Sequence, residues 1–335
     1  MANAFITGIE GLSLGANERA FLRDADPWGF ILFRRNVDTP GQVRALVAEL
    51  RDTVGRNAPV LIDQEGGRVQ RLAPPHWPSY PPGAFYGAIY DRDRAAGLAA
   101  AKLGARLIAS DLFALGIDVD CLPLADVPVS AADPVIGNRA YGMTPAKVAA
   151  IGAAVAQGLI EGGVLPVLKH IPGHGRATAD SHHRLPVVEV DRATLESSDF
   201  AAFRPLAKLP LGMTAHVVFS AIDPVAPATT SGTMVREVIR QHIGFDGLLM
   251  SDDVSMNALS GTLAERTRAA LRAGCDVVLH CNGKLDEMQA VAQESPPLAG
   301  DAARRADAAL AARRKPADFD IAAAREEFAA LMATT

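Results

Sequence analysis

The stretch Leu165–Gly175 reads LPVLKHIPGHG, an apolar run that leads into a lysine and two histidines. The first six residues have the length and apolar character of a strand that is covered on both faces. Pro172 and Gly173 prevent the residues that follow from forming a helix. The stretch therefore predicts a buried parallel strand with chemically active side chains at its C-terminal end.

Seven further short apolar runs alternate with long Ala-, Leu- and Arg-rich segments of helical period. The eight predicted strands are Phe5–Thr7, Gly29–Phe33, Val60–Asp63, Asp118–Pro123, Leu165–His170, Gly212–His216, Leu248–Asp252 and Asp276–His280. The predicted helices include Arg92–Leu115, Pro145–Gly162, Ala193–Ala207, Gly232–Ile243 and Leu263–Ala273. Eight βα units predict an α/β fold of the closed (β/α)8 TIM-barrel type, and a doubly wound open sheet is the alternative.

The domain organisation follows from length and from the absence of a linker-like segment. No low-complexity stretch divides the 335 residues, so we expect a single barrel domain over 1–335. The segment from about Pro296 onward is rich in alanine and mixed charge, and residues 296–335 are predicted to form C-terminal surface helices.

Composition narrows the class of protein. Hydrophobic residues make up 49% and charged residues 21%, as in soluble globular proteins. The net charge of −5 argues against a nucleic-acid partner. We expect no membrane partner and a cytoplasmic location, because the chain has neither a signal-like N-terminus nor a run long enough to span a bilayer. Cys121, Cys275 and Cys281 are predicted to be free thiols.

Polar residues recur where the predicted strands end. They are Asp63, Asp126, Lys169 with His170, His216, and Ser251 with Asp252 and Asp253. The C-terminal ends of the strands in a parallel barrel converge on one mouth, where such enzymes place their active sites. The alternative for Asp252 and Asp253 is that they cap a helix, and the alternative for Gly66–Gly67 is a simple tight turn.

The charged residues indicate a sugar site. Asp63, Arg71, Arg139 and Lys169 would supply hydrogen-bonding groups of both signs, which suit hydroxyls. Glycoside hydrolysis needs a carboxylate at the anomeric carbon and a proton donor at the leaving oxygen. Asp252 could supply the carboxylate, and His182, held by Asp180, could supply the proton.

A metal site is the main alternative for the histidine segment. His170 and His174 lie four residues apart, but Pro172 and Gly173 break the helix that would pair them as ligands. A loop site built from His170, His174, Asp180 and His182 remains open at this point, as does a metal-dependent barrel hydrolase.

Four motifs in this order resemble the bacterial β-N-acetylglucosaminidases of glycoside hydrolase family three. They are Asp63–Arg71, Lys169–Gly175, Asp180–His182 and Ser251–Met256, and the resemblance runs from about residue 5 to about residue 282. The resemblance implies a retaining hydrolase that removes terminal N-acetylglucosamine from anhydro-muropeptides during peptidoglycan recycling. It implies no metal and no organic cofactor, and it leaves any protein partner unknown.

The resemblance also assigns roles to residues. The nucleophile would be Asp252 rather than Asp253, and the acid/base would be His182 assisted by Asp180. The sugar contacts would be Asp63, Arg71, Arg139, Lys169 and His170. Departures are few: Ile171 stands where phenylalanine is commoner, and His183 where lysine or another polar residue is common.

Other readings within and outside this family stay open on sequence grounds. They are a β-glucosidase, a β-glycoside phosphorylase, a substrate-assisted mechanism that uses Asp252 and Asp253 as a pair, and a sugar-binding protein without turnover.

Overall fold

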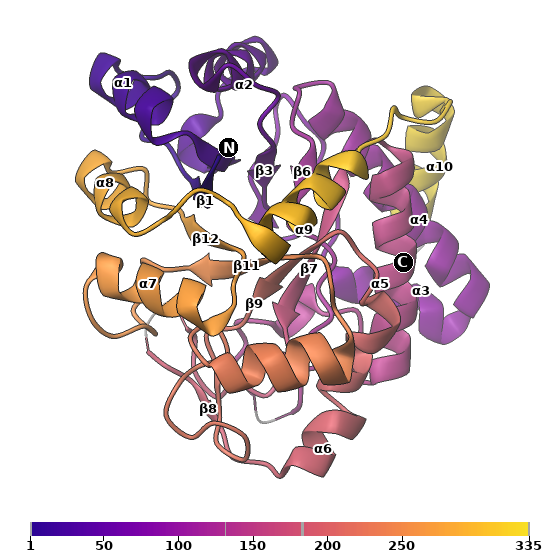
Figure 1. Ribbon diagram of the computed structural model, residues 1–335. Helices are drawn as coiled ribbons and strands as arrows, with labels where there is room; N and C mark the ends of the chain where they lie inside the picture. Colours follow the sequence, from indigo (N-terminus) through magenta and orange to yellow (C-terminus); the bar gives the residue numbers. More distant parts are fainter. Residues whose placement is uncertain (1, 131, 182–183, 334–335) are drawn as a thin grey trace.

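The computed structural model of the chain describes residues 2–130, 132–181 and 184–333. Within these residues eight parallel strands close into a barrel, in the spatial order β1, β2, β3, β6, β7, β9, β11, β12 and back to β1 (Figure 1). Their bounds are β1 Asn3–Thr7, β2 Pro27–Leu32, β3 Val60–Ile62, β6 Val119–Asp120, β7 Leu165–Ile171, β9 Leu211–Thr214, β11 Leu248–Asp253 and β12 Val277–His280. The predicted barrel is confirmed, and each of the eight predicted strands is a barrel strand.

The strand ends differ from the prediction mainly at β6, which is the shortest. The chain still pairs one residue beyond β6, since Cys121 N–H donates to the Ile62 carbonyl at 2.9 Å. Pro123 then has no N–H to contribute to a ladder. The regular strand therefore ends before the position that the apolar run suggested.

Helices surround the barrel on its outside (Figure 1). They are α1 Ala16–Ala25, α2 Pro40–Val54, α3 Gly83–Arg92, α4 Arg94–Phe113, α5 Pro145–Glu161, α6 Arg192–Ser197, the π-helix η5 Met234–Ile243, α7 Leu263–Ala273 and α8 Leu285–Gln293. The larger apolar core lies between strands and helices, and a second cluster inside the barrel includes Ile31, Val119, Val167 and Met213. No helix among the described residues has the length and apolarity to cross a bilayer.

The predicted helix Ala193–Ala207 is wrong as a continuous element. The chain instead forms α6 followed by two short 3-10 helices, η3 Phe200–Ala202 and η4 Arg204–Leu206. Asp199 turns inward at this break and accepts a hydrogen bond from Arg176 Nε at 2.6 Å. Pro205 has no N–H for an α-helical bond, so the helix cannot continue through it.

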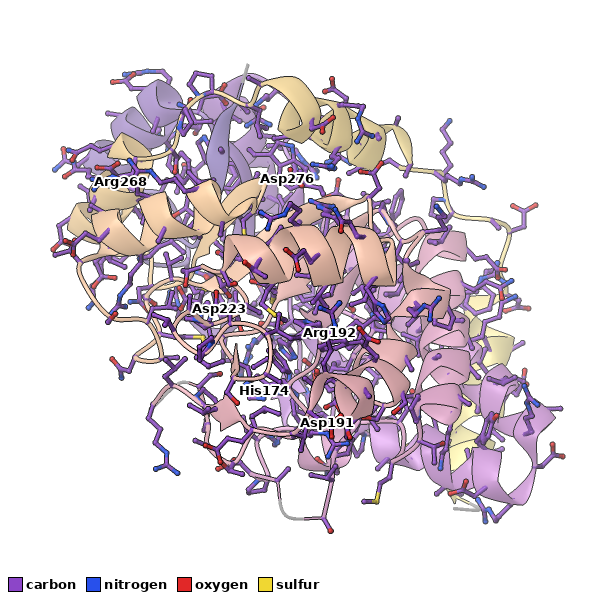
Figure 2. All side chains as sticks on the ribbon, turned by 60° about the horizontal axis from the view of Figure 1, so that its bottom comes forward. His174, Asp191, Arg192, Asp223, Arg268 and Asp276 are labelled. Atoms are coloured by element: carbon purple, nitrogen blue, oxygen red, sulfur yellow. The ribbon has the colours of Figure 1, made fainter. Side chains whose placement is uncertain are left out.

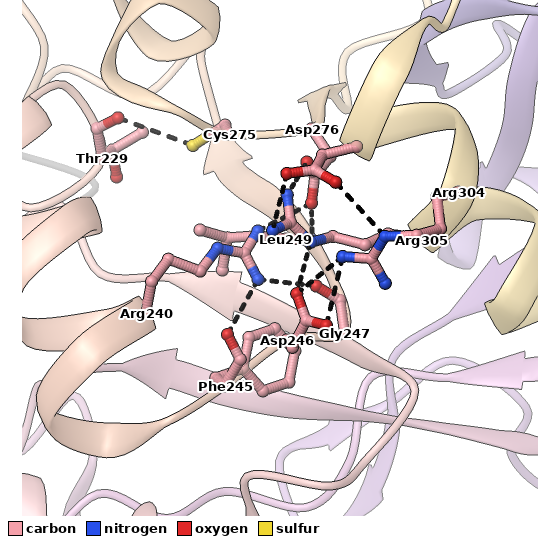
Figure 3. Close-up of polar contacts among 11 residues, drawn as sticks. Thr229, Arg240, Phe245, Asp246, Gly247, Leu249, Cys275, Asp276, Arg304 and Arg305 are labelled. Atoms are coloured by element: carbon pink, nitrogen blue, oxygen red, sulfur yellow. Dashed lines mark hydrogen bonds and ion pairs between the residues drawn. The ribbon is translucent and has the colours of Figure 1, made fainter.

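Residues beyond Pro296 form α9 Gly300–Ala311 and α10 Ile321–Ala333, as the alanine-rich composition predicted. Helix α9 is joined to the N-terminal ends of the last two barrel strands by an ion-pair cluster (Figure 3). We call this set the base cluster; it consists of Arg240, Asp246, Asp276, Arg304 and Arg305. Asp276 directly precedes β12 and accepts from Arg240 Nη2 at 2.8 Å and from Arg305 Nη1 at 3.1 Å.

The three cysteines are free thiols, as predicted. Cys121 and Cys275 are buried, and Cys281 is partly exposed at the end of β12.

Candidate active site

A cavity of about 320 Å³ opens at the C-terminal ends of the barrel strands. Seven of the predicted site residues line it: Asp63, Arg71, Arg139, Lys169, His170, Asp180 and Asp252. His182, the predicted acid/base, and His183 lie outside the described residues. The fold therefore brings together side chains from all four motifs at the C-terminal ends of the strands, and it adds Arg139 from the segment between the first and the second motif.

Lys169 is the centre of a charged network on one wall of the cavity. Its side chain is only 2% exposed, and its Nζ lies 2.9 Å from Asp63 Oδ1 and 2.7 Å from Glu65 Oε1. Arg71 Nη2 bonds the other oxygen of Asp63 at 2.9 Å. Arg139 binds Glu65 through two parallel bonds, with both N–O distances 2.8 Å. We call Asp63, Glu65, Arg71, Arg139 and Lys169 the mouth cluster.

The pairing keeps every member of the mouth cluster charged. Burial would raise the pKa of the Asp63 carboxyl, but Lys169 and Arg71 outweigh burial and hold this pKa well below its usual range. Lys169 and Arg139 likewise overcome burial at Glu65 and lower its pKa to about 2. Burial would lower the pKa of Lys169, whereas Asp63 and Glu65 raise it. The cluster thus presents fixed charges of both signs to a ligand.

A tight hairpin positions this network. Strands β4 Gln64–Gly66 and β5 Val69–Gln70 pair antiparallel and return Arg71 to Asp63. Gly66 and Gly67 have φ values of +91° and +57°, and a Cβ on Gly66 would collide with the Pro81 carbonyl. The two glycines therefore form a tight turn, as the alternative interpretation held, and this turn also returns Arg71 to Asp63.

Glu65 was missed by the sequence analysis, although it lies inside a quoted motif. It is buried and bridges Lys169 and Arg139. The available signal was a second carboxylate two residues after Asp63, within the motif that follows a predicted strand.

Asp126 organises the two histidines that follow β7. Its Oδ2 lies 2.8 Å from His170 Nδ1, and its Oδ1 accepts from the backbone N–H of His174 at 2.7 Å. Asp126 is fully buried, yet the two histidines lower its pKa against the effect of burial. The sequence placed Asp126 at a strand end but gave it no role; here it fixes how His170 faces the cavity.

His174 links the β7 end to the segment that carries Asp180. Its Nε2 lies 3.0 Å from Ser181 Oγ, and both side chains are buried. Burial and the neighbouring His170 lower the pKa of His174 to about 4, so the ring is neutral at neutral pH. Figure 2 shows His174 among the loops at this mouth, while Asp276 of the base cluster lies farther up in that view.

The two adjacent aspartates at the end of β11 have different surroundings. The carboxylate of Asp253 accepts from Ser255 N at 3.0 Å, from Ser255 Oγ at 2.6 Å and from Cys281 N at 3.2 Å. Asp252 is half-buried at the cavity, and its Oδ1 accepts from Asp253 N–H at 2.8 Å. Thr262 caps helix α7, so the helix-cap reading of the aspartates is wrong.

The metal alternative finds no support in the described part of the chain. Among residues 2–130, 132–181 and 184–333 no group of three or more His, Cys, Asp or Glu side chains could hold a metal ion. His170 and His174 meet edge to face, with ring centroids 5.8 Å apart, and their described hydrogen bonds go to Asp126 and Ser181. His182, the fourth member of the predicted loop site, lies outside these residues.

Comparisons with known proteins agree with this geometry. The family model for the glycosyl hydrolase family 3 N-terminal domain matches residues 10–299. A β-hexosaminidase of Alkalilimnicola ehrlichii is 42% identical over 281 residues, covering 82% of this chain and 79% of that protein. A β-hexosaminidase of Chromobacterium violaceum is 37% identical over 329 residues, covering 97% of this chain and 91% of that protein.

Solved structures show the same fold. The crystal structure of NagZ from Neisseria gonorrhoeae in complex with N-trifluoroacetyl-D-glucosamine has a TM-score of 0.86 and 32% identity, and the match covers 99% of this chain and 97% of that one. The resemblance drawn from the four motifs is thereby confirmed. The chain belongs to glycosyl hydrolase family 3 and is a glycoside hydrolase.

Proposed function

We propose that this protein is a retaining exo-β-N-acetylglucosaminidase. The observation that carries the proposal is one cavity lined both by the mouth cluster and by Asp252, with Asp180 and Ser181 beside them. The names of the curated relatives and the N-acylated glucosamine in the gonococcal structure support a hexosamine as the sugar. A cavity of about 320 Å³ is at the small end of ligand pockets, as expected for one terminal sugar.

The mouth cluster and His170 would bind the sugar hydroxyls. Asp63 keeps both carboxylate oxygens charged between Lys169 and Arg71, and each oxygen has lone pairs left to accept from a hydroxyl. Arg139 and Lys169 contribute donors whose positions Glu65 fixes. Because these charges are already paired, binding a sugar requires little rearrangement of the site.

Asp252 would act as the nucleophile. The Asp253 N–H that bonds Asp252 Oδ1 stabilises the ionised carboxylate and fixes its orientation. The carboxylate attacks the anomeric carbon and forms a glycosyl-enzyme ester while the leaving oxygen takes a proton. Water then attacks the same carbon, releases Asp252 and gives a product of retained configuration.

We assign the proton transfers to His182, assisted by Asp180. An imidazole with a reference pKa near 6.5 can donate a proton in the first step and accept one from water in the second. Support comes from the flanking residues, because Asp180 and Ser181 line the cavity and Ser181 is held by His174.

We further propose that residues 1–335 act as one catalytic domain and that the natural substrate is an anhydro-muropeptide processed in the cytoplasm during peptidoglycan recycling. The substrate and the pathway follow the family resemblance. The proposal of one domain is supported by the base cluster, since Arg304 and Arg305 of α9 pair with Asp246 and Asp276 at the barrel strands.

A substrate panel with product analysis tests the proposal. We expect 4-nitrophenyl β-N-acetylglucosaminide to be hydrolysed with a far higher kcat/KM than the β-glucoside, and NMR to show the β-anomer first. Inverted configuration, or a preference for the glucoside, would contradict the assignment. Release of a sugar phosphate when inorganic phosphate is added would instead identify a phosphorylase.

A further inference from the structure

The pairing of strand β11 with both neighbouring strands becomes irregular just before Asp252. Its regular pairing with β9 ends at Met250, opposite Met213, and its pairing with β12 shifts register between Met250 and Asp253. On the β12 side, Ser251 Oγ replaces a backbone acceptor and takes the N–H of Leu279 at 2.9 Å. The pairing with β12 resumes at Asp253, opposite Leu279, so Ser251 and Asp252 lie in an interruption of the ladder that side chains fill.

On the β9 side, three fully buried side chains replace the ladder. Thr214 Oγ1 accepts the N–H of Asp252 at 3.3 Å, and it lies 2.8 Å from Thr229 Oγ1. Thr229 Oγ1 lies 2.7 Å from His216 Nδ1. His216 Nε2 lies 2.9 Å from the carbonyl oxygen of Asp253. All three side chains have no solvent exposure.

These contacts form a closed chain that starts at the amide of Asp252 and ends at the carbonyl of Asp253. It holds the peptide group before Asp252 and the peptide group after Asp253, so the peptide group between the two residues cannot rotate freely. That middle peptide supplies the N–H that bonds Asp252 Oδ1. We propose that Thr214, Thr229 and His216 are positioning residues that aim the Asp252 carboxylate; this inference rests on the proposed role of Asp252 as nucleophile.

Hydrogen-bonding rules set the direction of the bond at the Asp253 end of this chain. A carbonyl oxygen can only accept, so His216 Nε2 carries a proton and donates to Asp253. Each threonine hydroxyl has one proton to donate and can also accept. Thr229 Oγ1 lies 2.7 Å from His216 Nδ1 and 3.1 Å from the Ala215 carbonyl oxygen, so it joins Thr214, His216 and the backbone just after β9. A buried polar chain that is fully satisfied is rigid, and rigidity is what a nucleophile aimed at one carbon atom needs.

A purely structural role would be served by apolar residues of similar shape. Valine has nearly the shape of threonine but no hydroxyl. At position 214 it could not accept the amide of Asp252, and at position 229 it could not join Thr214 to His216. A positioning role therefore predicts a loss of kcat in the threonine-to-valine variants, whereas a purely structural role predicts that kcat is kept.

The test measures kcat, KM and the inhibition constant for N-acetylglucosamine in Thr214→Val, Thr229→Val and the double variant. We expect kcat to fall about 10- to 100-fold in each single variant, because a small misplacement of a reacting group is costly. The inhibition constant should change less than about twofold, because the mouth cluster is untouched. The double variant should lose no more than the worse single variant, because both changes open the same chain.

Matched control variants distinguish an effect on the orientation of the Asp252 carboxylate from an effect on the stability of the fold. Thr267 is also fully buried, and its hydroxyl has no hydrogen-bond partner among the residues that the structure describes, so Thr267→Val in helix α7 should keep wild-type kcat. Thr214→Ser retains the hydroxyl and should restore most of the lost kcat. The melting temperature of each variant is recorded so that rates are compared where all are folded.

The outcomes distinguish this inference from the proposed function. If Asp252→Ala abolishes turnover while Thr214→Val and Thr229→Val keep kcat within about twofold of wild type, the positioning inference is wrong and the nucleophile assignment stands. If Asp252→Ala itself keeps near-normal kcat, the proposed function fails first.

Discussion

The mouth cluster and the base cluster are built from the same kinds of side chain at opposite ends of one barrel. Each joins two carboxylates to three cations through ion pairs of about 3 Å. In the base cluster, Asp276 is buried beside helix α9 and also takes the backbone N–H of Leu249 at 2.8 Å (Figure 3), whereas Asp246 and Arg304 are more than half exposed on the outer surface. The mouth cluster instead lines a cavity. A charged network is therefore a candidate binding site where its spare hydrogen-bonding capacity faces a cavity.

The largest expected loss of activity follows substitution of the proposed nucleophile, Asp252, at the mouth of the barrel. Asp252→Asn should lower kcat by roughly 10⁴-fold or more, because an amide cannot form the glycosyl ester. Steady-state kinetics with an aryl N-acetylglucosaminide would measure it. Asp253→Asn is the matched control at the next residue, and it should retain far more activity because its oxygen acts in a turn. Equal losses in the two variants would contradict the assignment.

The second prediction compares an arginine–carboxylate contact of the mouth cluster with one of the base cluster. Arg71→Met should lower kcat/KM by roughly 100-fold, because it removes a charged donor from the sugar site and leaves Asp63 with one cation. Arg304→Met removes an arginine from a more exposed ion pair, with Asp246 at the base, and should leave kcat/KM unchanged. A similar kinetic loss in both variants would mean that the mouth cluster has no special role in binding.

For stability we expect the opposite result, because a change in the base cluster should lower the free energy of unfolding without changing kcat/KM. Asp276→Asn leaves Arg240 and Arg305 with a neutral partner in a buried place, and we expect the free energy of unfolding to fall by about 3 kcal/mol. Urea unfolding measures this change, and kcat/KM of the folded variant should stay at the wild-type value. A large loss of activity at conditions where the variant is folded would show that the base cluster acts on the site.

Acid should lower the free energy of unfolding through His174 at the mouth. His174 has a pKa of about 4 in the folded protein, below the usual value near 6.5, so the unfolded chain binds more protons between these values. Stability is therefore lost as pH falls from about 6.5 to 4, by up to about 1.4 kcal/mol for each pH unit. Urea unfolding at pH 7 and pH 5 should show a smaller pH effect in His174→Asn than in wild type.

The exposed His76 provides the control for this pH effect. His76→Asn should leave the difference between pH 7 and pH 5 unchanged. If His174→Asn also leaves it unchanged, burial of His174 does not govern the acid response of the mouth.

Much of the mouth could be predicted from sequence because its geometry follows from local rules. Parallel strands put their ends at one edge, so Asp63, Lys169 and Asp252 had to approach one another once the eight strands were identified. The resemblance to the family then indicated Arg71, Arg139 and His170, and Asp180 was indicated by its place two residues before His182. The roles of these residues, and of His182, stay predictions.

The other features of the site and of the fold depend on contacts between distant residues, which no local sequence pattern encodes. Glu65 is recognisable only once Lys169 and Arg139 lie beside it, and Thr214 and Thr229 matter only because β9 and β11 part at Met250. The base cluster joins residues from three distant segments, so sequence spacing could not reveal it. The broken helix after Ser197 depends on the inward turn of Asp199 toward Arg176.

Covalent trapping tests the central claim most directly, namely that the Asp252 carboxylate forms a bond to the sugar. The enzyme is incubated with 5-fluoro-N-acetylglucosaminyl fluoride, digested and analysed by fragmentation mass spectrometry, which resolves residue 252 from residue 253. We predict one fluorosugar ester, on Asp252. An ester on Asp253, or turnover of the reagent without any covalent adduct on the protein, would contradict the account.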